Sequence, residues 1–317
     1  GDGGKQSMTF LAASIRDIGT NVLPRNFQGV DLTEFADNGR PVIQLVELNY
    51  STGELKIRAN ETLDANPSSL VNISKLFLSD ASSQRDISLL GSSPLTGQDK
   101  VITIVLTELQ RVQGIAISAT PGGDAGAAVM DFDTGALQDI GTNSLSEILG
   151  VSITEYRDSI IPVVFNATLN FSNGVMIISC SETIDMTPAG NVNLGKIFLS
   201  NTTGSKDLVL SGANIITTDG LLITLVLDID QRASAIAMSG TPGGDGATLV
   251  LDLEAGALID IAQNPIVDTP NLYLNEIPDT IPPAVLDVSV NYSTGLMLIN
   301  TSDIIDITPK DRIILNR

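Results

Sequence analysis

The side chains best suited to chemistry in this sequence are carboxylates that recur at equivalent positions, 121 or 122 residues apart. The recurring acidic positions are Glu61/Asp64, Glu182/Asp185 and Asp303/Asp306, then Asp17, Asp139 and Asp260, then Asp124 and Asp245 in two Pro-Gly-Gly-Asp turns. Clustered carboxylates suit Ca²⁺, a hard cation that prefers oxygen ligands. The sequence has no EF-hand or RTX loop, and Asp also caps turns through its own backbone. Turn capping and calcium binding both stand as interpretations, and the calcium candidates are Asp124, Asp245, Glu182 and Asp185.

Paired carboxylates are also the catalytic groups of glycosidases. Here the same pairs recur in every copy of a repeat, as structural residues do, whereas an active site is normally unique. The sequence contains no histidine, so its one cysteine, Cys180, has no imidazole base to activate it. A disulfide framework and a Cys/His zinc site are excluded within one chain. We predict that the protein is not an enzyme, that it has no catalytic or cofactor-binding residue, and that Cys180 is a small core residue.

The amino-acid composition and net charge exclude some classes of binding partner. The 317 residues are 43% hydrophobic, enough for real cores, and carry a formal net charge of −20. That charge repels phosphates and anionic membrane surfaces, so nucleic acid is not an expected partner. No stretch approaches the roughly 18 consecutive apolar residues of a membrane span, so membrane insertion is not expected either.

A second set of positions concerns modification rather than catalysis. The Asn-X-Ser/Thr sequons stand at Asn49, Asn60, Asn72, Asn166, Asn170, Asn201, Asn291 and Asn300. Most lie on the polar side of an expected strand or at a turn that ends one, where a bulky glycan fits. Asn and Thr are also ordinary surface and turn residues, which is the alternative interpretation. We expect N-linked glycans and hence an extracellular or cell-surface location.

Three copies of one pattern organise the chain. NYSTGELKIRANETLDANP at residues 49–67 returns as NFSNGVMIISCSETIDMTP at 170–188 and as NYSTGLMLINTSDIIDITP at 291–309. A fixed period without insertions is the signature of tandem repeats. We therefore divide the chain into residues 1–40, the C-terminal part of a repeat; 41–161 and 162–282, two full repeats; and 283–317, the N-terminal part of a repeat.

Within a repeat the hydrophobic period is two, as in half-buried strands. The expected inward side chains are Val46, Leu48, Tyr50, Leu55, Ile57 and Ala59, with Phe171, Tyr292 and Cys180 at equivalent inward positions. Further strands are expected at about 75–79, 86–90, 101–107, 114–119, 127–133 and 136–139, and a linker at about 154–161. No segment shows sustained helical periodicity. About seven short strands per repeat predict an all-β fold of tandem two-sheet sandwiches.

The motifs also carry a family resemblance. An Ile-Pro-Pro opening (281–283), Ser-Glu-Thr-Ile-Asp (181–185) and the closing Ala-Leu-Ile-Asp-Ile-Ala-Gln-Asn-Pro (257–265) resemble the bacterial Ig-like repeats of the SbsA type, and the large secreted tandem-repeat proteins of algae and other protists. The resemblance implies an extracellular structural or adhesive array and no catalytic residues.

Two functional classes follow. One is a structural subunit of an extracellular filament or surface array; the other is an adhesin whose loops bind carbohydrate or protein. Each partial repeat, at either end, needs the missing part of its sandwich to bury its core. That part comes either from adjoining repeats of a longer chain or from another copy of the protein, joined head to tail as a homopolymer.

Overall fold

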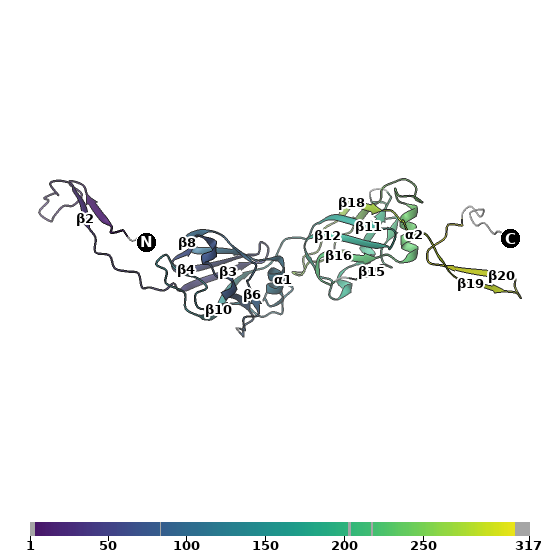
Figure 1. Cartoon of the computed structure of the whole chain (residues 1–317), viewed down its shortest axis with the longest axis horizontal. Helices are drawn as coiled ribbons and strands as arrows, with labels where there is room; N and C mark the ends of the chain where they lie inside the picture. Colours follow the sequence, from purple (N-terminus) through teal and green to yellow (C-terminus); the bar gives the residue numbers. More distant parts are fainter. Residues whose placement is uncertain (1–3, 83, 202–203, 217, 308–317) are drawn as a thin grey trace. The chain divides into compact units, whose positions relative to one another are not determined.

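The computed structural model describes residues 4–82, 84–201, 204–216 and 218–307 (Figure 1). The chain divides into two compact units. Unit 1 is Gly1–Leu48, Gly53–Gln110 and Ala127–Glu155; unit 2 is Asn49–Thr52, Arg111–Gly126 and Tyr156–Arg317. Unit 2 thus includes two short segments of the first sequence repeat. The parts of the predicted terminal segments that fall on residues 1–3 and 308–317 lie outside the described residues.

The first sequence repeat forms eight strands and one α-helix. They are β3 (Ile43–Asn49), β4 (Glu54–Ala65), β5 (Leu76–Ser79), β6 (Ile87–Ser88), β7 (Ser93–Pro94), β8 (Gly97–Val105), α1 (Glu108–Ala116), β9 (Val129–Phe132) and β10 (Ile148–Tyr156), with short 3-10 turns at Ser68–Leu70 and Ile73–Lys75. The strands pair in the order β6-β5-β9-β10-β3-β4-β8-β7.

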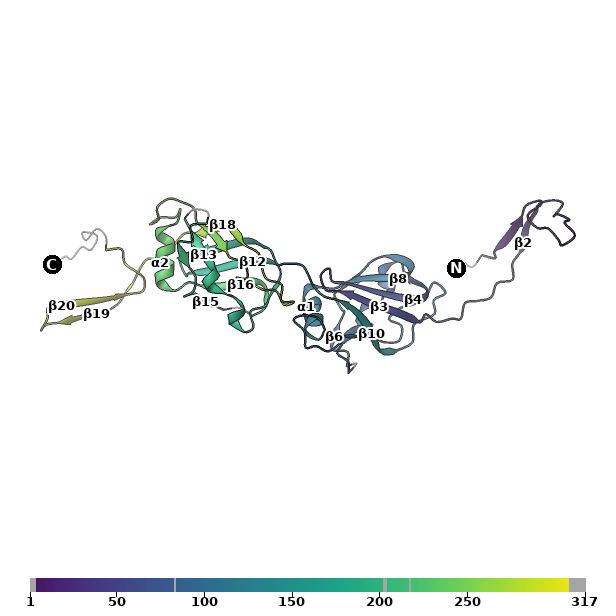
Figure 2. The same ribbon diagram turned by 180° about the vertical axis from the view of Figure 1, so that it is seen from behind.

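The second repeat has the same parts 121 residues later (Figure 2). They are β11 (Val164–Asn170), β12 (Val175–Ile184), β13 (Ile197–Ser200), β14 (Leu208–Val209), β15 (Asn214–Ile215), β16 (Gly220–Val226), α2 (Ile229–Ala237), β17 (Val250–Leu253) and β18 (Thr269–Ile277), with 3-10 turns at Ala189–Asn191 and Leu194–Lys196. Their order, β14-β13-β17-β18-β11-β12-β16-β15, repeats that of the first. The predicted fold class is confirmed: the chain is all-β, with tandem Ig-like β-sandwich repeats.

One strand joins the two layers of the second sandwich. The first half of β18 pairs antiparallel with β17, and its second half pairs parallel with β11. The change of partner comes between Tyr273 and Leu274, just after a register shift in the pairing with β17. The shift contains Asn271, whose φ is 62° and whose amide donates to Asp252 Oδ1 at 2.7 Å. A bulge of this kind re-aims a strand. The apolar faces of both layers then form one core cluster.

In the two full repeats, the period-two pattern correctly predicted which side chains are buried. Leu48, Leu55, Ile57 and Ala59 are all 0% exposed, as is Phe171. These residues alternate with polar neighbours on the outer face of β3, β4 and β11. Cys180 on β12 is buried and unpaired, as expected for a core residue.

The expected strand at 114–119 is wrong, because helix α1 covers the start of this segment. The feature that marks the start of this helix is a capping box, and not a periodic pattern of apolar residues. Gln110 N donates to Thr107 Oγ1 at 3.3 Å, and Thr107 N donates to Gln110 Oε1 at 2.9 Å. Asp228 and Gln231 make the same reciprocal pair at the start of α2. Such pairs satisfy amide groups that the first helical turn leaves unbonded.

Two further details differ from the sequence prediction. Residues 148–156 form strand β10, so the expected linker at 154–161 begins later than predicted. The expected strand at 136–139 is a turn with isolated bridges from Gln138 to Ser144 and from Asp139 to Leu63. The residues of β10 alternate between half-buried and exposed from Val151 to Tyr156, so a period-two signal for this strand was present in the sequence and was missed.

Each terminal segment forms a hairpin. Near the N-terminus β1 (Ser7–Phe10) pairs with β2 (Phe27–Asp31), and near the C-terminus β19 (Val285–Asn291) pairs with β20 (Leu296–Thr301). By offsets of 122 residues for β1, 121 for β2 and 242 for β19 and β20, the two hairpins correspond to β9 with β10 and to β3 with β4. Tyr292, predicted to face inward, is 94% exposed, because among the described residues no second sheet covers its hairpin.

No helix in the described part of the chain combines the length and apolar character required to cross a membrane.

Candidate functional site

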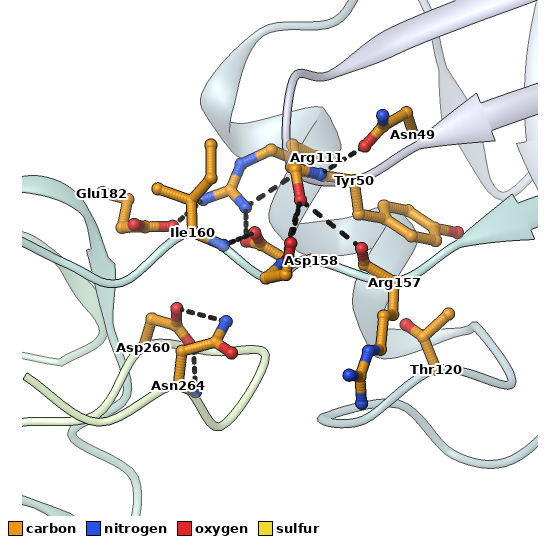
Figure 3. A network of polar contacts seen from close by, with 12 residues as sticks. Asn49, Tyr50, Arg111, Thr120, Arg157, Asp158, Ile160, Glu182, Asp260 and Asn264 are labelled. Carbon is orange, nitrogen blue, oxygen red and sulfur yellow. Dashed lines mark hydrogen bonds and ion pairs between the residues drawn. The ribbon is translucent and has the colours of Figure 1, made fainter.

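Three carboxylates meet inside unit 2 (Figure 3). Asp158, Glu182 and Asp260 each contribute an oxygen, and these oxygens all lie within 4.8 Å of one another. Their residues are only 3%, 6% and 1% exposed, respectively. We call these three residues the buried acid cluster. Three buried carboxylates at this separation repel one another unless positive charge or protons compensate them.

Asp158 enters the cluster from the segment that follows β10. Its Oδ1 accepts a hydrogen bond from the amide of Ile160 at 2.9 Å, an Asx turn that fixes the side chain. Its Oδ2 accepts from Arg111 Nη1 at 2.5 Å. One oxygen is therefore bound to the backbone and the other to a guanidinium.

Glu182 comes from the end of β12, where the pairing with β16 shifts register between Ser179 and Ile184. Its Oε2 accepts from Arg111 Nη2 at 3.3 Å, and its Oε1 is buried without a hydrogen-bond partner. Figure 3 shows the carboxylate directed toward Arg111. Burial, with the nearby charge of Asp158 next in importance, raises the pKa of Glu182 to about 8.

Asp260 lies in the loop that precedes β18 and is held by one neighbour. Asn264 donates its backbone amide to Asp260 Oδ1 at 2.7 Å and its side-chain amide to Oδ2 at 2.9 Å. An isolated bridge to Ile184 brings this loop to the end of β12. Burial raises the pKa of Asp260, while the bonds from Asn264 partly oppose that rise.

Arg111 supplies the positive charge. It projects from α1, is 7% exposed, and also donates to the carbonyl of Tyr50 at 3.2 Å. With all groups ionised, three negative charges face one positive charge. Arg111 bonds two of the three acids, because Asp158 and Glu182 are the ones within its reach.

The same three positions form a cluster in unit 1, 121 residues earlier. Oxygens of Asp37, Glu61 and Asp139 also lie within 4.8 Å of one another. We call them the open acid cluster, because Asp37 is exposed, Glu61 is half-buried and all three line an open pocket of about 460 Å³. Burial raises the pKa of Glu61, followed by the charges of Asp139 and Asp37.

The arginine contact recurs 121 residues later in unit 2. Arg232 on α2 is bonded to Asp303, as Arg111 is to Glu182, and it donates to the carbonyls of Phe171 and Ser172 at 3.1 and 2.9 Å. Asp279 stands where Asp158 does, and the amide of Ile281 donates to its Oδ1 at 2.9 Å. A helix arginine next to a strand-end carboxylate is thus a feature of the repeat.

The calcium candidates named from sequence divide in two. Glu182 lies in the buried acid cluster. Asp124, Asp185 and Asp245 each accept a hydrogen bond from the amide two residues later, the geometry of turn capping. Sequence reasoning singled out Asp260 as recurrent but missed Asp158 and Arg111. The 121-residue spacing could have revealed both. Asp158 has an aspartate at the equivalent position of the repeats before and after it, Asp37 and Asp279, and Arg111 has Arg232 one repeat later.

The sequons occupy different environments. Asn60, Asn166, Asn291 and Asn300 are exposed, whereas Asn49, Asn72, Asn170 and Asn201 are half-buried. Asn201 is a special case, because its side-chain nitrogen, the atom that carries an N-linked glycan, donates to Asp245 at 2.5 Å. Glycosylation at all eight remains a prediction.

Two further acids are fully buried but structural. Asp131 accepts from Ser79 Oγ at 2.6 Å and from the amide of Gly150 at 2.8 Å. Asp252 accepts from Ser200 and Asn271 in the same way. Each carboxylate thus accepts one bond from the neighbouring strand, β5 or β13, and one from the bulge in β10 or β18. These bonds give both acids a structural role.

No protein-family model and no curated protein matches the chain. Similar solved structures include one titled "Anomalous substructure of Titin-A168169", at 10% identity and a TM-score of 0.28, covering 75% of this chain and 99% of that one. "Tandem Ig repeats of Dlar" has 8% identity, a TM-score of 0.18 and coverages of 76% and 98%. A Dscam structure has 9% identity and a TM-score of 0.20, covering 79% of this chain and 56% of its own. At these TM-scores the likenesses carry no argument, and the fold rests on the chain's own strand order and core.

Proposed function

We propose that this chain is a structural part of an extracellular tandem array, in which successive Ig-like repeats are joined through apolar faces and buried polar contacts. The observation that carries the proposal is the state of the β19–β20 hairpin. It reproduces the β3–β4 and β11–β12 hairpins, yet among the described residues nothing covers the face that those two bury.

The comparison of equivalent residues is direct. Leu48 and Leu169 are both 0% exposed, whereas Val290 at the same position is 41% exposed. Tyr292 is 94% exposed where Phe171 is fully buried. The hairpin therefore presents a ready-made apolar strand face of the kind that pairs with another sheet.

The complement to this face is the other layer of a repeat, the layer that β13 and β17 provide for β11 and β12. Such a layer comes from adjoining repeats of the same chain or from a second copy. Contact between a head and the tail of the next molecule is heterologous and does not close on itself, so it extends into a filament. Both routes produce a long array.

The recurrence and bonding of the acidic residues also support a structural array. The clusters recur in successive repeats, and each aspartate accepts bonds that fix a loop or a bulge. These are features of a repeated structural part, whereas recognition by an adhesin is normally confined to one exposed site.

Electron microscopy of the native material tests the proposal. Ordered polymers with a regular repeat are the expected result, and isolated stalks carrying a ligand would instead identify an adhesin. Light scattering of the purified chain complements it: growth with concentration, abolished by Val290→Glu on the open hairpin face, supports joining between copies. Glu47→Gln, a change on the outer face of β3, is the matched control and should leave association unchanged.

Glycopeptide analysis of the same native material tests the extracellular location. We expect glycans at the exposed sequons Asn60, Asn166, Asn291 and Asn300, and none at Asn201, whose nitrogen is bonded to Asp245. Native material without glycans at any sequon would remove the argument for secretion that rests on them.

A further inference from the structure

The buried acid cluster contains one oxygen that the protein does not satisfy. Glu182 Oε1 has no hydrogen-bond partner among the described residues, and the residue is 6% exposed. Leaving a buried polar group unbonded costs about 1–3 kcal/mol, and more when the group is charged. A folded protein therefore normally places a donor or a cation beside such an oxygen.

Charge gives the same indication. With all three acids ionised, as ligands of a cation are, Asp158, Glu182 and Asp260 bring three negative charges and Arg111 brings one positive charge. The net charge of −2 is the charge that one bound divalent cation would neutralise. Surface clusters neutralise such an excess with water and diffuse ions, but a cluster in which every acid is at most 6% exposed lacks that outlet.

The spacing of the oxygens fits a calcium ion. Ca²⁺ binds oxygens at about 2.3–2.6 Å, so two of its ligands lie up to about 4.6–5.2 Å apart when they face each other across the ion. The three carboxylates offer oxygens that all lie within 4.8 Å of one another. One ion can therefore contact all three without a large movement of the backbone.

We propose that Asp158, Glu182 and Asp260 bind one Ca²⁺ ion in unit 2, with Arg111 and Asn264 positioning the carboxylates. The ligand set is all oxygen, which favours calcium or magnesium over transition metals. Calcium is favoured over magnesium because it accepts irregular coordination, whereas magnesium demands a near-ideal octahedron at about 2.0–2.1 Å.

The proposal differs from the calcium candidates read from the sequence, because only Glu182 is shared. It also does not depend on the array function. A calcium-binding Ig-like repeat is compatible with an array, an adhesin or neither, so failure of one proposal leaves the other standing.

Isothermal titration calorimetry of the full chain, stripped of metal with EDTA and titrated with CaCl₂, tests the site. We expect one strong binding event per chain. Glu182→Gln keeps the shape of the side chain and removes its charge, and it should weaken this event by at least about tenfold. Glu61→Gln makes the same change in the open acid cluster and should leave the event unchanged.

Thermal unfolding separates binding from folding. Wild-type protein should unfold at a higher temperature in CaCl₂ than in EDTA, because a ligand that binds only the folded state stabilises it. In EDTA at pH 9, where Glu182 is ionised, Glu182→Gln should be at least as stable as wild type, since it removes an unsatisfied buried charge, yet it should gain nothing from CaCl₂. Asp260→Asn serves as a second variant if Glu182→Gln fails to fold.

Three results would overturn the proposal. One is the absence of binding at millimolar CaCl₂. Another is a binding event that Glu61→Gln removes and Glu182→Gln preserves. The third is equal binding of MgCl₂ and CaCl₂ that neither Glu182→Gln nor Asp260→Asn affects.

Discussion

The two acid clusters have corresponding residues but different surroundings. Asp37, Glu61 and Asp139 in unit 1 open onto a pocket of about 460 Å³, whereas Asp158, Glu182 and Asp260 in unit 2 are buried. Glu61 faces two acids, while Glu182 also bonds Arg111. Three carboxylates at the same spacing therefore cost little free energy when they are open to solvent. When they are buried, desolvation makes them costly unless a positive charge compensates them, as Arg111 on α1 does here.

The largest effect should come from removing that countercharge. Arg111→Met leaves Asp158 and Glu182 buried without their shared partner, and breaking a buried ion pair on one side costs about 3–5 kcal/mol. Chemical unfolding in EDTA, followed by circular dichroism, should show this loss. Arg232→Met is the matched control: Asp303 is 20% exposed, against 1% and 7% for the side chains of Asp158 and Glu182, so the loss should be smaller. Equal losses would contradict the role assigned to burial.

The pH dependence should also distinguish the clusters. The pKa of Glu182 is raised from 4.5 to about 8, so the folded state holds its proton more tightly than the unfolded state does. Its contribution to stability is therefore fully present below pH 4.5 and is lost as the pH rises through 8.

Melting temperatures between pH 5 and pH 9 in EDTA measure this effect. Relative to wild type, Glu182→Gln should be more stable at pH 9, by on the order of 2 kcal/mol, and less dependent on pH. Glu61→Gln should change the profile less, since its carboxyl reaches the open pocket. A wild-type profile that Glu182→Gln leaves unchanged would show that another group sets the pH dependence.

A smaller difference should appear between two equivalent glycines. Both Gly122 and Gly243 have positive φ, at +90° and +98°, so alanine is strained at either position. A Cβ at Gly122 would lie 2.0 Å from the carbonyl oxygen of Ile261, whereas one at Gly243 would lie 3.4 Å from Ile236 Cγ2. We expect Gly122→Ala to lose about 1–2 kcal/mol more than Gly243→Ala in the same unfolding measurement. Similar losses would mean that the loop at Gly122 moves away freely.

The smallest effect concerns Cys180. Burial raises the pKa of its thiol to about 12, with the charge of Glu182 adding to that rise. The thiol should therefore react slowly with an alkylating reagent at pH 8 until the protein is unfolded. Cys180→Ala should lose only about 1 kcal/mol, because Ala59 occupies the equivalent position and is fully buried. Rapid labelling of the folded protein would contradict this placement.

The sequence by itself determined the repeat and most of its strands. The spacing of 121 residues aligns the sequence of β3 with those of β11 and β19. The period-two alternation of apolar and polar residues is enough to identify Leu48 and Leu169 as core residues. Both signals are local or periodic, so they need no knowledge of which segments meet. The helix α1 was within reach of the same reasoning, since Thr107 and Gln110 form a capping box, but its short apolar pattern resembles a strand.

Only the tertiary structure decided the character of the acid clusters. Asp158, Glu182 and Asp260 are separated by up to 102 residues, and no local pattern says that their oxygens meet within 4.8 Å. The pKa of Glu182 depends on desolvation and on neighbouring charges, both of which come from packing between distant segments. Equivalent acids in the two repeats therefore carry the same sequence signal and acquire different chemistry, because burial and the reach of Arg111 are properties of the folded chain.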